Sequence, residues 1–431
     1  MKINRAYRVE LAPNDVQRTS FLRAAGCARW AYNWGLRKKI DAWDARKAAL
    51  AAGMPKADAP KVPTAIDLHK ELNLLKKVPA DQGGVPWMYE SSKSAPQEAL
   101  RNLDKAFDGF FRRCKSGIKG PKGFPRFKSK KKGIGGFRLP EGSATTTHAI
   151  LPRIGLVKLK EHGYLPIKAD LDVRVLGAAV SEQAGHWFVS LQVEQELLDP
   201  TDRSHLPVIG VDVGIKVLAT CSDGTVFEDP KALKAGTRRL RMLQKLVPRK
   251  VKGSNNRRKA VRKVARQHYR ISCVRKDALH KASDAITKRC SVVVLEDLNV
   301  AGMLKNHCLA RAVSDSSMSE LHRQIKYKAA WRGVQVLVAD LWFPSSKTCS
   351  SCGKVKAELS LGEREFCCDF CGVIEDRDLN AAINLRNLAG SSPVTACGEA
   401  SSGLVGNDPA KLASVKQEPN TDQGLSLIGS V

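Results

Sequence analysis

The sequence predicts an α+β protein of several domains. Amphipathic helical patterns fill residues 12–116, alternating strand patterns run from 150 to 195, and apolar strands separated by basic helices occupy 206–390. A chain of 431 residues that is 43% hydrophobic has enough apolar material for more than one core. We therefore expect two or three domains, and the sequence contains no internal repeat that would indicate a solenoid.

The first 116 residues predict a strand followed by a helical module. Residues 1–11 alternate apolar and polar side chains, which is typical of a strand and not of a signal peptide. Asn14 is placed to cap the next helix. The apolar residues of that helix recur at near-helical spacing and should face a core: Val16, Leu22, Ala25, Trp30 and Trp34. Two further amphipathic stretches complete the module at 12–116, and the second carries Leu100, Leu103, Phe107 and Phe111 on one face.

Residues 117–203 predict a basic loop that leads into a small β-barrel or curled sheet. Glycine and proline interrupt regular structure in the loop, and its cations lie beside Phe124 and Phe127. A charged run is usually a solvated surface, but aromatic residues among the charges favour phosphate contact and base stacking. Strand patterns follow, with Trp187, Val189 and Leu191 facing the barrel core. The candidate nucleic-acid contacts in the loop are Arg126, Lys128, Lys130 and Lys131.

Residues 204–345 and 374–390 predict an α/β domain with a basic insert at 231–290. The insert contains twenty-one Lys or Arg residues but only two acids, Asp277 and Asp284. Its apolar residues have helical spacing, so we expect a helical hairpin with a cationic polar face. The candidate nucleic-acid contacts here are Arg238, Arg239, Arg257, Arg258 and Arg262. Residues 391–431 are poor in large apolar groups, which predicts a disordered tail.

The charge of the chain favours a polyanionic partner. There are 72 Lys and Arg residues against 43 Asp and Glu, a formal net charge of +29. Phosphate contacts with such a surface release counterions, so nucleic acid is the expected partner and a small-molecule substrate is not. No apolar run approaches the roughly 18 residues of a membrane span. Without a signal peptide, we expect the protein to stay in the cytoplasm.

The cysteines predict a metal site. Cys349 and Cys352 form one C-x2-C pair, Cys368 and Cys371 form another, and fifteen residues separate the pairs. This spacing is typical of a structural zinc site with four thiolates. Cys367 adjoins the second pair, but only Cys368 keeps the x2 spacing, and Gly353 suits a tight turn around metal. The remaining cysteines are scattered, which fits a reducing compartment better than a disulfide framework.

Three acids in distant segments predict a second metal site. Asp212 lies inside an apolar strand, between VIGV and VGIKVL, where a carboxylate is costly to bury unless it is paired or binds metal. Glu296 lies in another such strand, although neighbouring Asp297 on the same strand would face the opposite side and the pattern favours neither. Asp378 begins a helix, where it competes with Glu375 and Asp376 and could be a simple N-cap. Two divalent cations about 4 Å apart at a scissile phosphate would need such convergence. The three acids therefore fit a metal-dependent nuclease of the RNase H-like kind.

The order of the acids and six sequence segments resemble those of one protein family. DNA strand-transfer transposases with this fold place Glu last, whereas Glu in the middle resembles RuvC-type nucleases. The segments GVDVGIKVLAT, VVVLEDLNVAGM, FPSSKTCSSCG, FCCDFCG and DRDLNAAINL follow FPRFKSKKK in this order. Together they resemble the TnpB (OrfB) proteins of insertion sequences over about residues 1–390. TnpB proteins are RNA-guided DNA endonucleases related to type V CRISPR effectors.

The resemblance implies a role for each part of the chain. It makes Asp212, Glu296 and Asp378 the RuvC catalytic triad, binding Mg²⁺ or Mn²⁺. It makes the four paired cysteines ligands of a structural zinc in a ribbon at 346–373, inserted in the RuvC domain. It makes 12–116 a recognition lobe, and 1–11 with 117–203 a wedge-like barrel. The implied partners are a guide RNA from the same transposon and target DNA beside a short flanking motif, in the nucleoid of a prokaryotic cell.

Two other functions fit parts of the same pattern. One is a guide-directed DNA-binding protein or repressor whose acids are structural. The other is an accessory protein of transposition. Intact acids at all three positions favour a nuclease over both.

Overall fold

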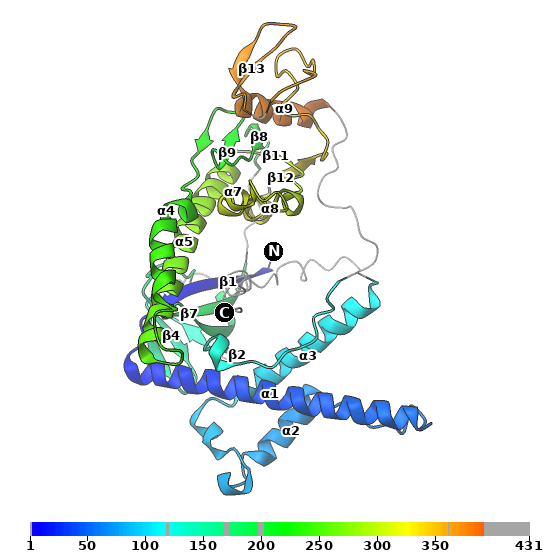
Figure 1. Cartoon of the computed structure of the whole chain (residues 1–431), viewed down its shortest axis with the longest axis vertical. Helices are drawn as coiled ribbons and strands as arrows, with labels where there is room; N and C mark the ends of the chain where they lie inside the picture. Colours follow the sequence, from blue (N-terminus) through cyan, green and yellow to red (C-terminus); the bar gives the residue numbers. More distant parts are fainter. Residues whose placement is uncertain are drawn as a thin grey trace. The chain divides into compact units, whose positions relative to one another are not determined.

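The computed structural model describes residues 2–117, 120–140, 142–166, 173–196, 202–360 and 362–391. They belong to two compact units that divide between Leu197 and Leu198. Figure 1 shows the helices and strands of both units. The predicted disordered tail lies outside the described residues from position 392 onward.

The sheets of the first unit are antiparallel. The larger sheet has the order β1-β7-β6-β2, from Lys2–Leu11, His186–Glu196, Val173–Gln183 and Gly136–Leu139. A smaller sheet has the order β3-β4-β5, from Ser143–Ala144, His148–Leu151 and Gly155–Lys158. Strand β1 pairs along its whole length with β7, from Lys2 opposite Glu196 to Leu11 opposite Trp187. Trp187, Val189 and Leu191 are all buried, as their alternation predicts.

Three helices pack together in the first unit. They are α1 (Asp15–Ala51), α2 (Ala65–Leu75) and α3 (Ser94–Lys115), with 3₁₀ turns η1 (Ala80–Gln82), η2 (Pro86–Glu90) and η3 (Lys130–Lys132). Asn14 caps α1 as predicted, because its Oδ1 accepts from the Gln17 amide at 2.8 Å. Helices α1, α2 and α3 meet at Gly35, where a Cβ would lie 2.6 Å from Leu100 and 3.3 Å from Leu68.

The predicted apolar face of α1 is wrong at two positions. Val16 is 77% exposed and Leu22 is 45% exposed. The buried face instead consists of Phe21 and Leu36 with a run of small residues: Ala24, Ala25, Ala28 and Ala31. Small side chains let the backbones of neighbouring elements approach α1 closely along this face, so large apolar residues outside the face remain exposed. On α3 the predicted face is confirmed, since Leu100, Leu103 and Phe107 are buried and Phe111 packs against the same core.

The second unit is built on a five-stranded sheet of order β10-β9-β8-β11-β12. Its strands are Val226–Phe227, Ala219–Cys221, Val208–Asp212, Val292–Glu296 and Gln335–Ala339. Strands β8, β11 and β12 run parallel to one another, whereas β9 pairs antiparallel with β8 and β10 pairs antiparallel with β9. The helices are α4 (Ala232–Leu246), α5 (Asn255–Lys288), α6 (Val300–Met303), α7 (Ala310–Ser316), α8 (Met318–Arg332) and α9 (Arg377–Ser391).

Helices cover both faces of this sheet. Val293 and Leu295 share a core with Leu279 of α5 and Leu321 of α8. Val294, on the opposite face of β11, packs with Leu385 of α9. This two-sided burial explains why β8 and β11 read as continuous apolar runs.

Helices α4 and α5 form the predicted basic hairpin. Arg257 donates to the Val247 carbonyl oxygen at 3.1 Å and so joins α5 to the end of α4. The start of α4 lacks a side-chain cap of its own. The buried Asp315 carboxylate of α7 takes that place, accepting from the Leu233 amide at 2.9 Å and from Arg275 at 2.8 Å. The hairpin is therefore tied to α7 at its base.

Candidate active site and metal centre

Asp212 and Glu296 lie at the same edge and on the same face of the sheet. Strands β8 and β11 are parallel neighbours with Val211 opposite Leu295, so their carboxyl ends meet. Side chains alternate along a strand, and Asp212 falls on the side of Gly210 while Glu296 falls on the side of Val294. Gly210 and Val294 both face α9. The two carboxylates therefore point to the face that α9 covers.

Helix α9 crosses β8 in direct backbone contact. A Cβ at Gly210 would lie 2.1 Å from the Ala382 carbonyl oxygen and 2.5 Å from the Arg386 nitrogen. Only glycine permits this approach. It brings the first turn of α9, and with it Asp378, toward the end of β8.

The competing acids near Asp378 have structural partners. The Asp376 carboxylate accepts from the Asp378 amide at 2.9 Å and from the Leu379 amide at 3.1 Å, so Asp376 is the residue that caps α9. Glu375 accepts from the Ser350 hydroxyl at 2.9 Å. The N-cap role that could have explained Asp378 thus belongs to Asp376.

The charge of Asp297, the rival of Glu296, acts on His322 of α8. Burial lowers the pKa of His322 to about 4, and the negative charge of Asp297 partly opposes this lowering.

The acids interact electrostatically. Burial raises the pKa of Asp212 most, the negative charges of Glu296 and Asp378 raise it as well, and the pKa reaches about 8. Burial also raises the pKa of Glu296, while a hydrogen bond from the Ser345 hydroxyl lowers it. Carboxylates that repel one another in a shielded site are stabilised by a divalent cation, and oxygen donors of this kind suit Mg²⁺ or Mn²⁺. The donor set therefore fits such an ion.

The four paired cysteines form a cluster that could hold zinc. Their sulfurs all lie within 4.8 Å of one another. Cys349 and Cys371 are 3.6 Å apart at sulfur, as are Cys352 and Cys368. A disulfide would need about 2.05 Å, whereas metal–sulfur bonds of about 2.3 Å in a tetrahedron give sulfur separations of about 3.8 Å. The spacing therefore fits a tetrahedral metal ion and no disulfide.

Two matching turns build this cluster. The Gly353 amide donates to the Cys349 carbonyl oxygen at 2.9 Å, and the Gly372 amide donates to that of Cys368 at 3.1 Å. Both glycines have a positive φ, 73° and 72°. Gly372 repeats the role predicted for Gly353, and the shared C-x2-C-G pattern could have identified it. Cys367 lies exposed in β13 (Glu365–Cys367), which pairs with β14 (Ile374–Asp376).

Most candidate nucleic-acid contacts are exposed. In the loop, Lys128 is held to α1, because Asn33 accepts from its amide and donates to its carbonyl oxygen, both at 2.8 Å. On the hairpin, Arg257 fastens α5 to α4 and is only half-exposed. The other predicted contacts have exposed side chains: Arg126, Lys130, Lys131, Arg238, Arg239, Arg258 and Arg262.

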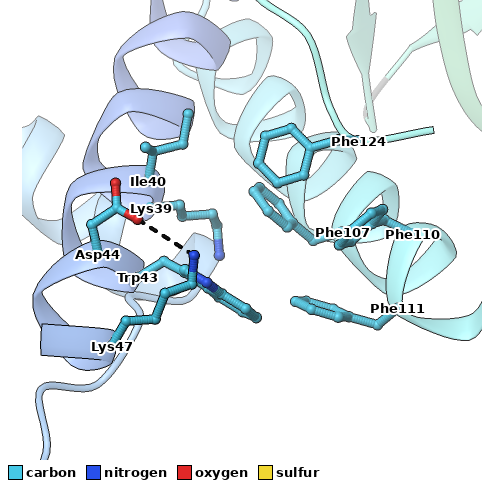
Figure 2. A pocket seen from close by; sticks show the side chains of 9 residues that line it. All are labelled: Lys39, Ile40, Trp43, Asp44, Lys47, Phe107, Phe110, Phe111 and Phe124. Atoms are coloured by element: carbon cyan, nitrogen blue, oxygen red, sulfur yellow. Dashed lines mark ion pairs between the residues drawn. The ribbon is translucent and has the colours of Figure 1, made fainter. Parts of the chain in front are cut away.

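An aromatic pocket between α1 and α3 was not predicted. Figure 2 shows its lining, in which Trp43 faces Phe111 across the pocket. These two rings stack with centroids 5.2 Å apart and planes at 19°. The cavity is about 100 Å³, and Phe124 of the basic loop closes one side. Phe110 could have indicated this pocket from the sequence, because Phe110 and Phe111 are adjacent on a helix and cannot both face one core.

Comparison with known proteins identifies the family. A family model described as "Probable transposase" (OrfB_IS605) matches residues 188–307, and one described as "Cas12f1-like, TNB domain" matches 319–385. A protein of Streptomyces pristinaespiralis named "Putative RNA-guided DNA endonuclease" is 35% identical over 97% of both chains. The chain belongs to the TnpB (OrfB) family.

Two other similar proteins also cover nearly the whole chain. "Putative RNA-guided DNA endonuclease InsQ" of Escherichia coli is 30% identical over 93% of this chain and 95% of its own. A solved "mini-RNA-guided endonuclease CRISPR-Cas_phi3" aligns with a TM-score of 0.43 and 10% identity, over 92% of this chain and 94% of that one. A model described as "Helix-turn-helix domain" matches residues 1–48. In this TnpB protein those residues form strand β1 and nearly all of the continuous helix α1.

The described helices of this TnpB protein include none that could cross a membrane.

Proposed function

We propose that this chain is an RNA-guided DNA endonuclease that hydrolyses DNA at Asp212, Glu296 and Asp378. One observation carries the proposal: the ends of β8 and β11 and the start of α9, far apart in sequence, bring together three carboxylates. The charges of Glu296 and Asp378 both raise the pKa of Asp212. Membership of the TnpB family and the names of the relatives support guided DNA cleavage as the reaction.

Each carboxylate has a definite part in the proposed chemistry. Asp212 and Glu296 lie on adjacent strand ends, so they would hold one side of a divalent-metal site. Asp378 would complete that site from α9. Bound Mg²⁺ or Mn²⁺ would activate water and stabilise the leaving 3′-oxygen in an in-line hydrolysis. Seryl or cysteinyl covalent intermediates play no part in this scheme.

The remaining parts would bind nucleic acid or stabilise the fold. The exposed arginines of α5 would contact phosphates of guide RNA transcribed from the same element, which pairs with the target strand. Residues 12–116 would be a recognition lobe, 1–11 with 117–203 a wedge-like domain, and 204–345 with 374–390 a RuvC-like domain. A zinc ion held by the four cysteines would stabilise the ribbon at 346–373. A short DNA motif beside the target would be read by the protein itself.

The decisive experiment uses the protein purified with the RNA that accompanies it from its native locus. That RNA is sequenced, and cleavage of a matching DNA is measured with Mg²⁺. Asp212→Ala, Glu296→Ala and Asp378→Ala should each abolish cleavage and leave DNA binding nearly unchanged. Asp297→Ala is the matched control and should cleave normally. Undiminished cleavage by Asp212→Ala would refute the site, and guided binding without any wild-type cleavage would favour a repressor.

A further inference from the structure

Helix α9 carries two buried asparagines one turn apart. Asn380 is completely buried and Asn384 is 5% exposed. Residues i and i+4 of a helix lie on the same face, so both side chains point the same way. Buried amides are costly unless every donor and acceptor finds a partner. The partners of these two therefore show what this face of α9 holds.

Both asparagines bind the backbone that leads into the cysteine cluster. Asn380 donates to the Thr348 carbonyl oxygen at 2.7 Å and accepts from the Ser350 amide at 2.8 Å. Asn384 donates to the carbonyl oxygens of Thr348 at 2.6 Å and Ser345 at 2.8 Å. Cys349, the first cysteine of the cluster, lies between the residues that Asn380 binds. The first metal knuckle is thus fastened to the helix whose first turn contains Asp378.

The same segment also reaches the second strand of the candidate active site. The hydroxyl of Ser345, whose carbonyl oxygen binds Asn384, donates to the Glu296 carboxylate. A single stretch of six residues, 345–350, therefore touches the cysteine cluster, the helix of Asp378 and the side chain of Glu296. Hydrogen bonds to a metal-binding carboxylate fix its orientation.

We propose that Ser345, Asn380 and Asn384 are positioning residues through which the cysteine cluster sets the geometry of the catalytic carboxylates. This inference rests on the proposed metal site at Asp212, Glu296 and Asp378. Zinc in the cluster would make the 345–350 segment rigid. The asparagines would pass that rigidity to α9, and Ser345 would pass it to Glu296. Occupancy of one metal site would thereby raise the affinity of the other, and the effect must be reciprocal.

The test measures Mn²⁺ binding by electron paramagnetic resonance, alongside DNA cleavage and zinc content. Ser345→Ala should weaken Mn²⁺ binding and slow cleavage by roughly 10–100-fold, the range seen when such outer partners are removed. Ser345→Thr keeps the hydroxyl and should restore both. Zinc content should stay at one ion per chain in both variants. If Ser345→Ala binds Mn²⁺ as tightly as the wild type, the positioning role of Ser345 is excluded.

A second pair of variants tests the asparagines. Asn384→Asp keeps the size of the side chain but replaces the amide donor by an acceptor that faces two carbonyl oxygens. It should weaken Mn²⁺ binding, whereas Asn387→Asp, on the exposed face of the same helix, should not. Equal Mn²⁺ affinity in these two variants would overturn the proposal. A wild type that binds Mn²⁺ without cutting DNA would refute the proposed endonuclease alone, since the Mn²⁺ comparison still decides the positioning role.

Discussion

Replacing Gly210 by alanine would put a methyl carbon into the backbone of α9. The new Cβ would lie 2.1 Å from the Ala382 carbonyl oxygen and 2.5 Å from the Arg386 nitrogen. A relaxed carbon–oxygen contact is about 3.3–3.6 Å, so α9 would have to move outward by roughly 1 Å. The atoms in the way are backbone, so no change of rotamer can relieve the clash. Asp378, in the first turn of α9, would move with the helix.

This displacement should harm cleavage more than folding. Overpacking of this kind costs about 1–3 kcal/mol of the free energy of unfolding, whereas a 1 Å misplacement at a reacting centre can lower the rate about 100-fold. Single-turnover cleavage and urea unfolding of Gly210→Ala measure the two effects. Gly390→Ala is the control on the same helix, because its Cβ would meet no atom within 4 Å. If Gly210→Ala cleaves DNA as fast as the wild type, the close packing of α9 on β8 is not needed to place Asp378.

Three further predictions follow from the metal sites and the charge. Removing zinc with a chelator should make residues 346–373 protease-sensitive, because small cysteine modules gain their folding energy from metal; continued resistance would disprove the four-cysteine site. The raised pKa of Asp212 means that its contribution to stability is complete below pH 3.8 and is lost as the pH rises toward about 8. In Mg²⁺-free buffer, urea midpoints should therefore fall over this range in the wild type and less in Asp212→Asn, and equal slopes would contradict the buried acid. Replacing Arg258 and Arg262 by glutamine should reduce the salt dependence of RNA binding, and an unchanged slope would remove α5 from the RNA interface.

The parts of the site that depend on local pattern could be predicted from the sequence. Asp212 could be identified because apolar residues flank it on both sides, and the C-x2-C spacing of the cysteines requires no knowledge of the fold. The choice between Glu296 and Asp297 could not be made in this way. Alternation shows that they face opposite sides, but only the position of α9 shows which of them faces the helix that carries Asp378. The same holds for Asp376, whose capping bonds depend on where α9 begins.

Asn380 and Asn384 show a different limit of sequence reasoning. Within DLNAAINL they are polar residues at helical spacing, a pattern that normally predicts a solvent-exposed face. The backbone they bind comes from some thirty residues earlier, and its Ser345 and Thr348 carbonyl oxygens accept from the two helix side chains. Buried amides on the helix satisfy those groups, whereas leucine at the same positions would leave them without partners. The polarity of this face of α9 is therefore a consequence of the irregular cysteine knuckle that packs on it.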